Sequence, residues 1–153
     1  MGNIFDQKFH EIDSSFFYKI LRLRVDVFVV EQNCPYPELD GFDLALNTRH
    51  IWIANEDTPV SYLRLVNEDE KTNRISRVVT SVDNRGEGLA KTLVEHVINT
   101  TSGKLTLDAQ TYLENWYMEM GFVANGETFE ECCGQETNPG ILHVPMVHER
   151  EID

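Results

Sequence analysis

A strand-turn-helix segment at residues 78–91 constrains the fold of this chain more than any other feature. Residues 78–82 are mostly β-branched, the turn after them holds Gly86 and Gly88, and an apolar helical pattern follows. Small residues in such a turn let the backbone approach a ligand closely, and the first amides of the next helix have no intrahelical partner and can bind an anion. The segment therefore predicts a phosphate-binding loop between a strand and a helix.

The spacing Arg85-x-x-Gly88-x-Ala90 separates this loop from two common types. A Walker loop ends in Gly-Lys-Ser/Thr, which is absent, and a dinucleotide fingerprint needs a third small residue where Lys91 stands. The pattern resembles the acyl-CoA loop of the GNAT superfamily of N-acetyltransferases, whose motif is Gln/Arg-x-x-Gly-x-Gly/Ala after a strand. Taken alone, the match also fits an ordinary strand-to-helix turn opened by a glycine.

The acidic composition narrows the classes of partner. The formal net charge of −13 opposes binding to nucleic acid, because that binding depends on Lys and Arg neutralising phosphates. Four of the 13 basic side chains lie in the segment that contains the loop: Arg74, Arg77, Arg85 and Lys91. We expect them to gather at a cofactor's phosphates while the acidic remainder attracts a cationic amine. They are also compatible with solvated charges that flank a strand.

The length of 153 residues predicts one domain, 1–153. No apolar run approaches the roughly 20 residues of a membrane span, and the N-terminus lacks a basic region followed by an apolar one. We therefore expect no membrane association and a cytoplasmic location. The cysteines, Cys34, Cys132 and Cys133, predict reduced thiols. With His143 and His148 they lack Cys-x-x-Cys spacing, so no metal site is predicted.

The remaining pattern predicts a mixed α/β (α+β) architecture. An amphipathic helix is predicted at 13–32, capped by Asp13 or Ser14 and interrupted on its apolar face by Arg24, with a loop at 33–47 after it. Strands are predicted at 50–54, 60–66, 74–82, 103–110, 122–132 and 141–147, with a helix at 86–100. A capping box at Thr111 and Glu114 predicts a last helix, ended by Gly121. The order predicts a mostly antiparallel sheet flanked by helices.

Two further motifs extend the resemblance to GNAT enzymes. Ala109-Gln110 is followed by Tyr117 and by Gly121-Phe122, where that family keeps a cofactor-contacting polar residue and a tyrosine that protonates the departing thiolate. Residues 22–43 contain Arg-x-x-Val-Phe-x-x-Glu-Gln-x-Cys-x-Tyr-x-Glu-x-Asp-x-x-Asp, which resembles the small bacterial ElaA-like subgroup. The segment 130–139 is longer than the subgroup suggests, and Ala90 and Lys91 depart from its commoner loop residues.

The resemblance implies the GNAT (acyl-CoA N-acyltransferase) fold and transfer of an acetyl group from acetyl-CoA to a primary amine by direct attack, without a metal. It implies that the cofactor binds to Val78, Val79, Thr80, Arg85, Gly86, Glu87, Gly88, Leu89, Ala90, Lys91 and Gln110. Tyr117 is the expected acid. A general base is also needed, because an ammonium ion must lose a proton before it attacks. His50 and Glu38 are the first candidates for that base, and Glu31, Asp40 and Asp43 stay open.

Other functions remain compatible with the sequence. A non-catalytic acyl-CoA-binding or sensing domain would keep the loop but has no reason to place Tyr117, and a nucleotide-binding module should accept ATP in place of CoA. An acyl-cysteine intermediate is disfavoured because no cysteine has an adjacent histidine as base. A homodimer is compatible with the sequence, which does not set the oligomeric state or the amine acceptor.

Overall fold

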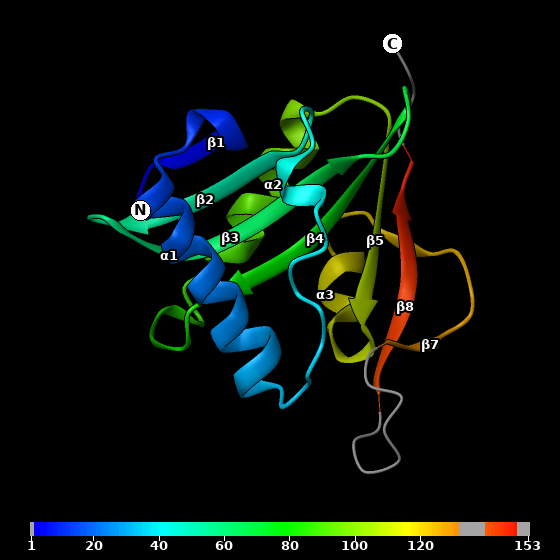
Figure 1. Cartoon of the computed structure of the whole chain (residues 1–153). Coiled ribbons are helices and arrows are strands. Elements are labelled where there is room, and N and C mark those ends of the chain that lie inside the picture. Colours follow the sequence, from blue (N-terminus) through cyan, green and yellow to red (C-terminus); the bar gives the residue numbers. More distant parts are fainter. Residues whose placement is uncertain (1, 132–139, 150–153) are drawn as a thin grey trace.

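An eight-stranded sheet forms the centre of the computed structural model, which describes residues 2–131 and 140–149 (Figure 1). The strands are β1 Ile4–Lys8, β2 Arg49–Asn55, β3 Thr58–Asn67, β4 Thr72–Thr80, β5 Lys104–Gln110, β6 Val123–Ala124, β7 Phe129–Glu131 and β8 Ile141–His148. The α-helices are α1 Ser14–Val25, α2 Leu89–Thr100 and α3 Glu114–Met118. None of the helices in the described part of the chain is long and apolar enough to cross a membrane.

The sheet order is β1-β2-β3-β4-β5-β8-β6, with β7 also paired to β8. Every pair is antiparallel except β4 with β5, which run parallel. Because β4 and β5 are parallel, the chain between them must cross over, and α2 makes that connection. The predicted mixed, mostly antiparallel sheet flanked by helices is confirmed.

Helices cover both faces of the sheet, and side-chain alternation along the strands decides which core each residue joins. Tyr62 of β3 packs with Phe17 and Ile20 beneath α1, whereas Leu63 and its neighbours on the opposite face pack beneath α2. Figure 1 shows α1 crossing one face of the sheet and α2 on the other. Successive strand residues point to opposite faces, so β3 supplies both cores.

The first helix is shorter than predicted. Asp13 caps it as expected, accepting hydrogen bonds from the backbone amides of Ser15 and Phe16. Helix α1 ends at Val25 and continues as a π-helical turn, Asp26–Glu31, instead of an α-helix to residue 32. The wider turn changes the direction of the side chains that follow, and π-turns of this kind are frequent at functional sites.

Three other predictions need correction. Strand β1 was not predicted, because five residues at the sheet edge carry little periodic signal. The capping box of Thr111 and Glu114 is not formed, because Thr111 begins a 3₁₀ turn and neither that turn nor α3 has a side-chain cap. Cys34 is disulfide-bonded, not a reduced thiol. Cys132 and Cys133, and most of the long segment 130–139, lie outside the described residues.

Candidate active site

A cavity of about 670 Å³ opens between β4 and β5. The two strands pair at three positions only, Thr72 with Lys104, Asn73 with Leu105 and Arg74 with Thr106. Beyond Arg74 no pairing joins the described residues of β4 and β5, yet residues 75–80 and 107–110 of the two strands line the same cavity. The sheet therefore separates at its centre and leaves strand edges facing the cavity.

A bulge in β4 lies at this opening. Tyr62 of β3 pairs with Val79 and Arg64 pairs with Ser76, so one residue on β3 opposes two on β4, Arg77 and Val78. Arg77 has a φ of 57°, in the left-handed region that a non-glycine residue seldom adopts. An extra residue bends a strand and redirects its backbone groups. The bulge thus turns the end of β4, Val78 to Thr80, along the wall of the cavity.

The glycine loop joins the end of β4 to α2. Gly86 and Gly88 have φ values of 82° and 76°, and Gly88 is the N-cap of α2 without a side-chain cap. A Cβ built at either glycine meets no atom within 4 Å, so the loop faces open space. The amides at the start of this 12-residue helix lie beside an open surface, a geometry that is able to accept an anion.

Only some of the residues predicted to bind the cofactor line the cavity. Arg85 and Ala90 line the cavity, whereas Leu89 is buried in the core. Gly86, Glu87, Gly88 and Lys91 lie outside the cavity lining, on the open turn and first helical residues. On the strands, Val78, Val79, Thr80 and Gln110 all line the cavity.

The four basic side chains near the loop do not gather at one spot. Arg74 pairs with Glu68 and Asp108, at the end of the cavity where β4 and β5 are still joined. Arg77 pairs with Glu38 and Asp40. Arg74, Arg77 and Arg85 all line the cavity, and the Nε of Arg85 donates to the Thr80 carbonyl at 3.2 Å. The expected cluster at the loop is not formed, because Arg74, Arg77 and Arg85 are each paired with a carboxylate.

Tyr117 lies at the cavity on helix α3 and is only 4% exposed. Its ring contacts Trp116 and Phe122 edge to face, at centroid distances of 4.7 and 5.8 Å. Burial raises the pKa of the phenol, and Tyr112 raises it further. The hydroxyl therefore keeps its proton at neutral pH and is able to donate it.

Three carboxylates predicted as candidate bases form a network with three arginines, buried at Arg24, Glu38, Asp43 and Arg64 and reaching the surface at Asp40. Arg24, fully buried on α1, pairs with Glu38 at 2.9 Å and with Asp43 at 2.7 Å. Arg64 pairs with Asp40 at 2.8 Å and with Asp43 at 3.1 Å. Arg77 completes the set through its pairs with Glu38 and Asp40 at 2.9 and 3.3 Å. The charges balance, which is the condition for burying them.

This arginine–carboxylate network gives the irregular residues after α1 a fixed path. Burial disfavours the charged form of Asp43, but hydrogen bonds and charge from Arg24 and Arg64 outweigh it and lower its pKa. The same balance lowers the pKa of Asp40 through Arg64 and Arg77. Glu38, 5% exposed, has one oxygen on Arg24 and the other on Arg77. The lowered pKa values make Asp40 and Asp43 poor acceptors for a substrate proton.

His50 is placed away from the cavity. Its ring is fully buried, with Nδ1 2.7 Å from the Tyr62 hydroxyl and Nε2 3.0 Å from the Asp43 carbonyl oxygen. Burial lowers the pKa of the ring, so it stays neutral. His50 ties β2 to β3 and to the arginine–carboxylate network, and it does not line the cavity.

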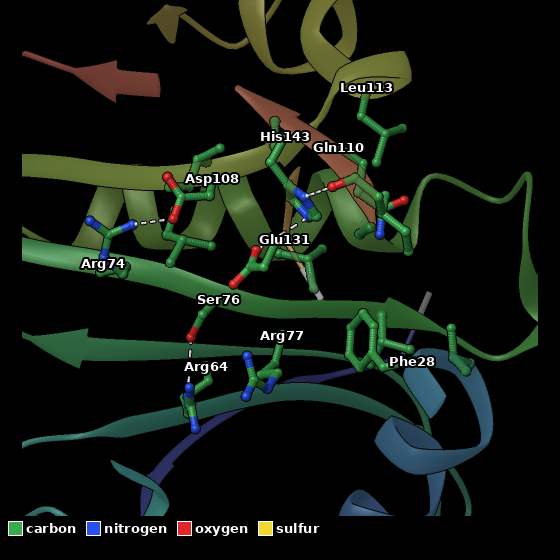
Figure 2. Close-up of a pocket in the computed structure, with 18 of the residues that line it drawn as sticks. Phe28, Arg64, Arg74, Ser76, Arg77, Asp108, Gln110, Leu113, Glu131 and His143 are labelled. Atoms are coloured by element: carbon green, nitrogen blue, oxygen red, sulfur yellow. Dashed lines mark hydrogen bonds and ion pairs between the residues drawn. The ribbon is translucent and has the colours of Figure 1, made fainter. Parts of the chain in front are cut away.

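The cavity also contains His143, which the sequence analysis considered only as a metal ligand, and Glu131, which it did not consider. His143 of β8 is paired in register with Gln110, and its Nε2 lies 3.5 Å from a carboxylate oxygen of Glu131. Figure 2 shows both side chains in the space between β5 and β4, with Ser76 and Arg77 on the opposite wall. The pairing of β8 with β5 brings His143 next to Gln110. The two residues are far apart in the sequence, so their proximity could not be predicted from it.

The π-turn supplies the remaining wall. Val27, Phe28 and Glu31 line the cavity from this turn, and Glu31 pairs with Arg85 at 3.0 Å. Cys34 also lines it, and its disulfide leaves no thiol there to act as a nucleophile. Among residues 2–131 and 140–149, no three His, Cys, Asp or Glu side chains lie together as a set able to hold a metal ion.

Comparisons with known proteins agree with this geometry. A family model described as "Acetyltransferase (GNAT) domain" matches residues 31–150. The UPF0039 protein Rv2851c of Mycobacterium tuberculosis is 42% identical over 142 residues, 90% of this chain and 86% of that protein. The crystal structure of Escherichia coli ElaA, 35% identical, covers 97% of this chain and 100% of its own, with a TM-score of 0.85. An acyl-CoA N-acyltransferase from Pseudomonas aeruginosa, 32% identical, covers 97% and 99%, with a TM-score of 0.86.

Proposed function

The chain belongs to the GNAT acetyltransferase family, in its ElaA-like subgroup, and we propose that it transfers an acetyl group from acetyl-CoA to a primary amine. The amine attacks the thioester directly while both substrates are bound. The supporting observation is the opening between β4 and β5, which has the glycine loop at one end and the Tyr117 phenol on its wall.

The cofactor position follows from the exposed backbone. The pantetheine arm carries amide groups, and it lies along Val78, Val79 and Thr80 as an added strand would, where β5 has separated from β4. Its pyrophosphate binds at Gly86, Glu87 and Gly88 and the first amides of α2, and Gln110 contacts the arm from the β5 side. An acyl-CoA N-acyltransferase of the same fold, from Pseudomonas aeruginosa, supports a CoA thioester as the donor.

Tyr117 acts as the general acid. A thiolate leaves more readily if it is protonated as the carbon–sulfur bond breaks, and a phenol that burial keeps protonated is a suitable donor. Tyr117 lines the cavity, so its proton is available to a ligand bound there.

The acidic surface suits a cationic acceptor and disfavours nucleic acid as a substrate. The net charge of −13 produces a negative potential that attracts an ammonium ion and repels a polyphosphate away from the loop.

A thiol-release assay tests this function. Purified protein is incubated with acetyl-CoA and a panel of primary amines that includes diamines, amino sugars and short peptides. We expect CoA release that depends on both substrates and a mass increase of one acetyl group on the amine. Calorimetry separates the alternatives, because an acyl-CoA sensor would bind CoA without releasing thiol, and a nucleotide-binding module would bind ATP as well as CoA. No heat with any CoA derivative would overturn the proposal.

A further inference from the structure

We propose that His143 is the general base that takes the proton from the acceptor ammonium, and that Glu131 is the residue that positions it. This inference rests on the proposed function and assigns it a base outside the five candidates that the sequence suggested.

The tautomer of the His143 ring is set by its neighbours. Nδ1 lies 2.7 Å from the carbonyl oxygen of Ile141, which only accepts hydrogen bonds, so Nδ1 carries the hydrogen. In the neutral ring Nε2 then holds a free lone pair. Nε2 faces an oxygen of Glu131 at 3.5 Å. Once Nε2 gains a proton it becomes able to donate to that carboxylate, so Glu131 is placed to hold the ring in position.

The His143 ring lines the cavity and is otherwise mostly covered by protein. The side chain of His143 is 11% exposed, and the Phe129 ring stacks on it with a centroid distance of 5.8 Å. His143 pairs in register with Gln110, and directly opposed residues of an antiparallel pair share a face of the sheet. Gln110 is the residue assigned to the cofactor arm, so His143 stands one strand away from it (Figure 2).

Other charged groups around the cavity are already paired. Glu131 faces the ring from β7, while Asp108 of β5 pairs with Arg74 of β4 at 3.0 Å. Tyr117 of α3 is neutral, and Glu31 is paired with Arg85. Glu131 is therefore the one carboxylate in the described cavity wall that faces a histidine rather than an arginine.

The protons balance with these two residues. Nε2 of His143 takes one proton from the ammonium, and the freed lone pair forms the carbon–nitrogen bond. The carbon–sulfur bond then breaks, and the sulfur takes the Tyr117 proton. The second amine proton restores the phenol, and His143 releases the first to solvent. The products are the amide, CoA and one proton.

The variant His143→Gln tests the base with an amine that the wild type turns over. Loss of a general base costs about 100-fold or more in kcat, while acetyl-CoA affinity stays within a few-fold. The remaining rate should rise with pH as more amine becomes uncharged. An amine weakened by fluorine substitution, and so uncharged at neutral pH, should lose much less. Equal losses for both amines, or an unchanged kcat, would overturn the assignment.

Two measurements test Glu131 and the tautomer. Glu131→Ala removes the group that holds the His143 ring in place, so kcat should fall while acetyl-CoA affinity stays within a few-fold, and Glu131→Gln should restore part of kcat. An unchanged kcat in Glu131→Ala contradicts the positioning role. Nitrogen-15 NMR of the wild type reports the tautomer without turnover. A neutral ring protonated at Nε2 would overturn the inference even if no acceptor were found, whereas a wild type inert with every amine and with CoA overturns the proposed function.

Discussion

At the scale of single residues, burial has opposite consequences for the two residues that the sequence favoured for proton transfer. Tyr117 is buried against the cavity wall, and burial preserves the proton that an acid must donate. His50 is buried between β2, β3 and the arginine–carboxylate network, where both ring nitrogens already have partners. Sequence alone identified both as titratable groups, but their usefulness depends on what surrounds each ring.

Replacing Tyr117 by Phe should lower turnover by about tenfold or more, because the thiolate would leave without a proton donor. Acetyl-CoA affinity should stay within a few-fold, since the ring and its contacts with Trp116 and Phe122 remain. Steady-state thiol release and calorimetry measure the two quantities. Tyr112→Phe is the matched control, because Tyr112 lines the same cavity but is exposed. Full turnover by the Tyr117 variant would remove it from the mechanism.

At the scale of secondary-structure elements, the strand, the glycine loop and α2 depend on backbone conformations that few residues adopt. Arg77 makes the bulge and Gly88 opens the helix, both with positive φ. The sequence indicated the turn at the glycines, because glycine is the usual residue at positive φ. The bulge could not be predicted in this way, because arginine does not indicate a left-handed conformation. The bulge arises from the register of β3 with β4.

Gly88→Asp should abolish cofactor binding, because a carboxylate at the start of α2 would face the pyrophosphate. Gly88→Asn has the same size and similar tolerance of positive φ, so it isolates the charge. Gly41→Asp, at a φ of 85° with no atom within 4 Å of its Cβ, controls for backbone strain away from the loop. Calorimetry with CoA compares the three. Tight binding by Gly88→Asp would mean that the pyrophosphate lies elsewhere.

Helix α1 depends on Arg24 for its connection to the segment after the π-turn. Removing one member of a buried charge network leaves its partners uncompensated and costs about 3–5 kcal/mol. Arg24→Met should therefore lower the free energy of unfolding by an amount in that range, measured by urea denaturation. Arg22→Met, on the same helix in an exposed pair with Asp26, should change it little. Equal effects of the two variants would show that the network adds no stability.

At the scale of the whole molecule, the sequence predicted the loop and most of the element order, but it missed β1 and predicted one strand at 122–132 where the structure has β6 and β7. The comparisons confirm the family. Periodicity reports which residues face a core, so α2 and the central strands were found with small errors at their ends. Partners in sheet order and in the arginine–carboxylate network were not predicted. Arg24 and Asp43 are 19 positions apart, and only folding shows that they meet. The place of His143 in the cavity was missed for the same reason.

The arginine–carboxylate network should make the whole fold sensitive to acid. Asp40 and Asp43 have pKa values below the ordinary 3.8, so the unfolded chain binds their protons at higher pH than the folded chain does. Their contribution to stability is complete above that value and is lost as pH falls from it through the folded pKa. Urea unfolding at a series of pH values should show this decline, and Asp43→Asn should flatten it. An identical slope in the variant would contradict the assignment.

The short parallel pairing of β4 with β5 divides the sheet into two halves, β1–β4 and β5–β8, joined by three register pairs and by the crossover helix. We expect local opening of the native state to begin at this short pairing. Amide hydrogens of β4 and β5 beyond Arg74 should exchange sooner than those of β2 and β3. A thioester arm bound between the two strand edges would then hold them together. Binding of the donor would therefore also rigidify the surface to which the acceptor binds.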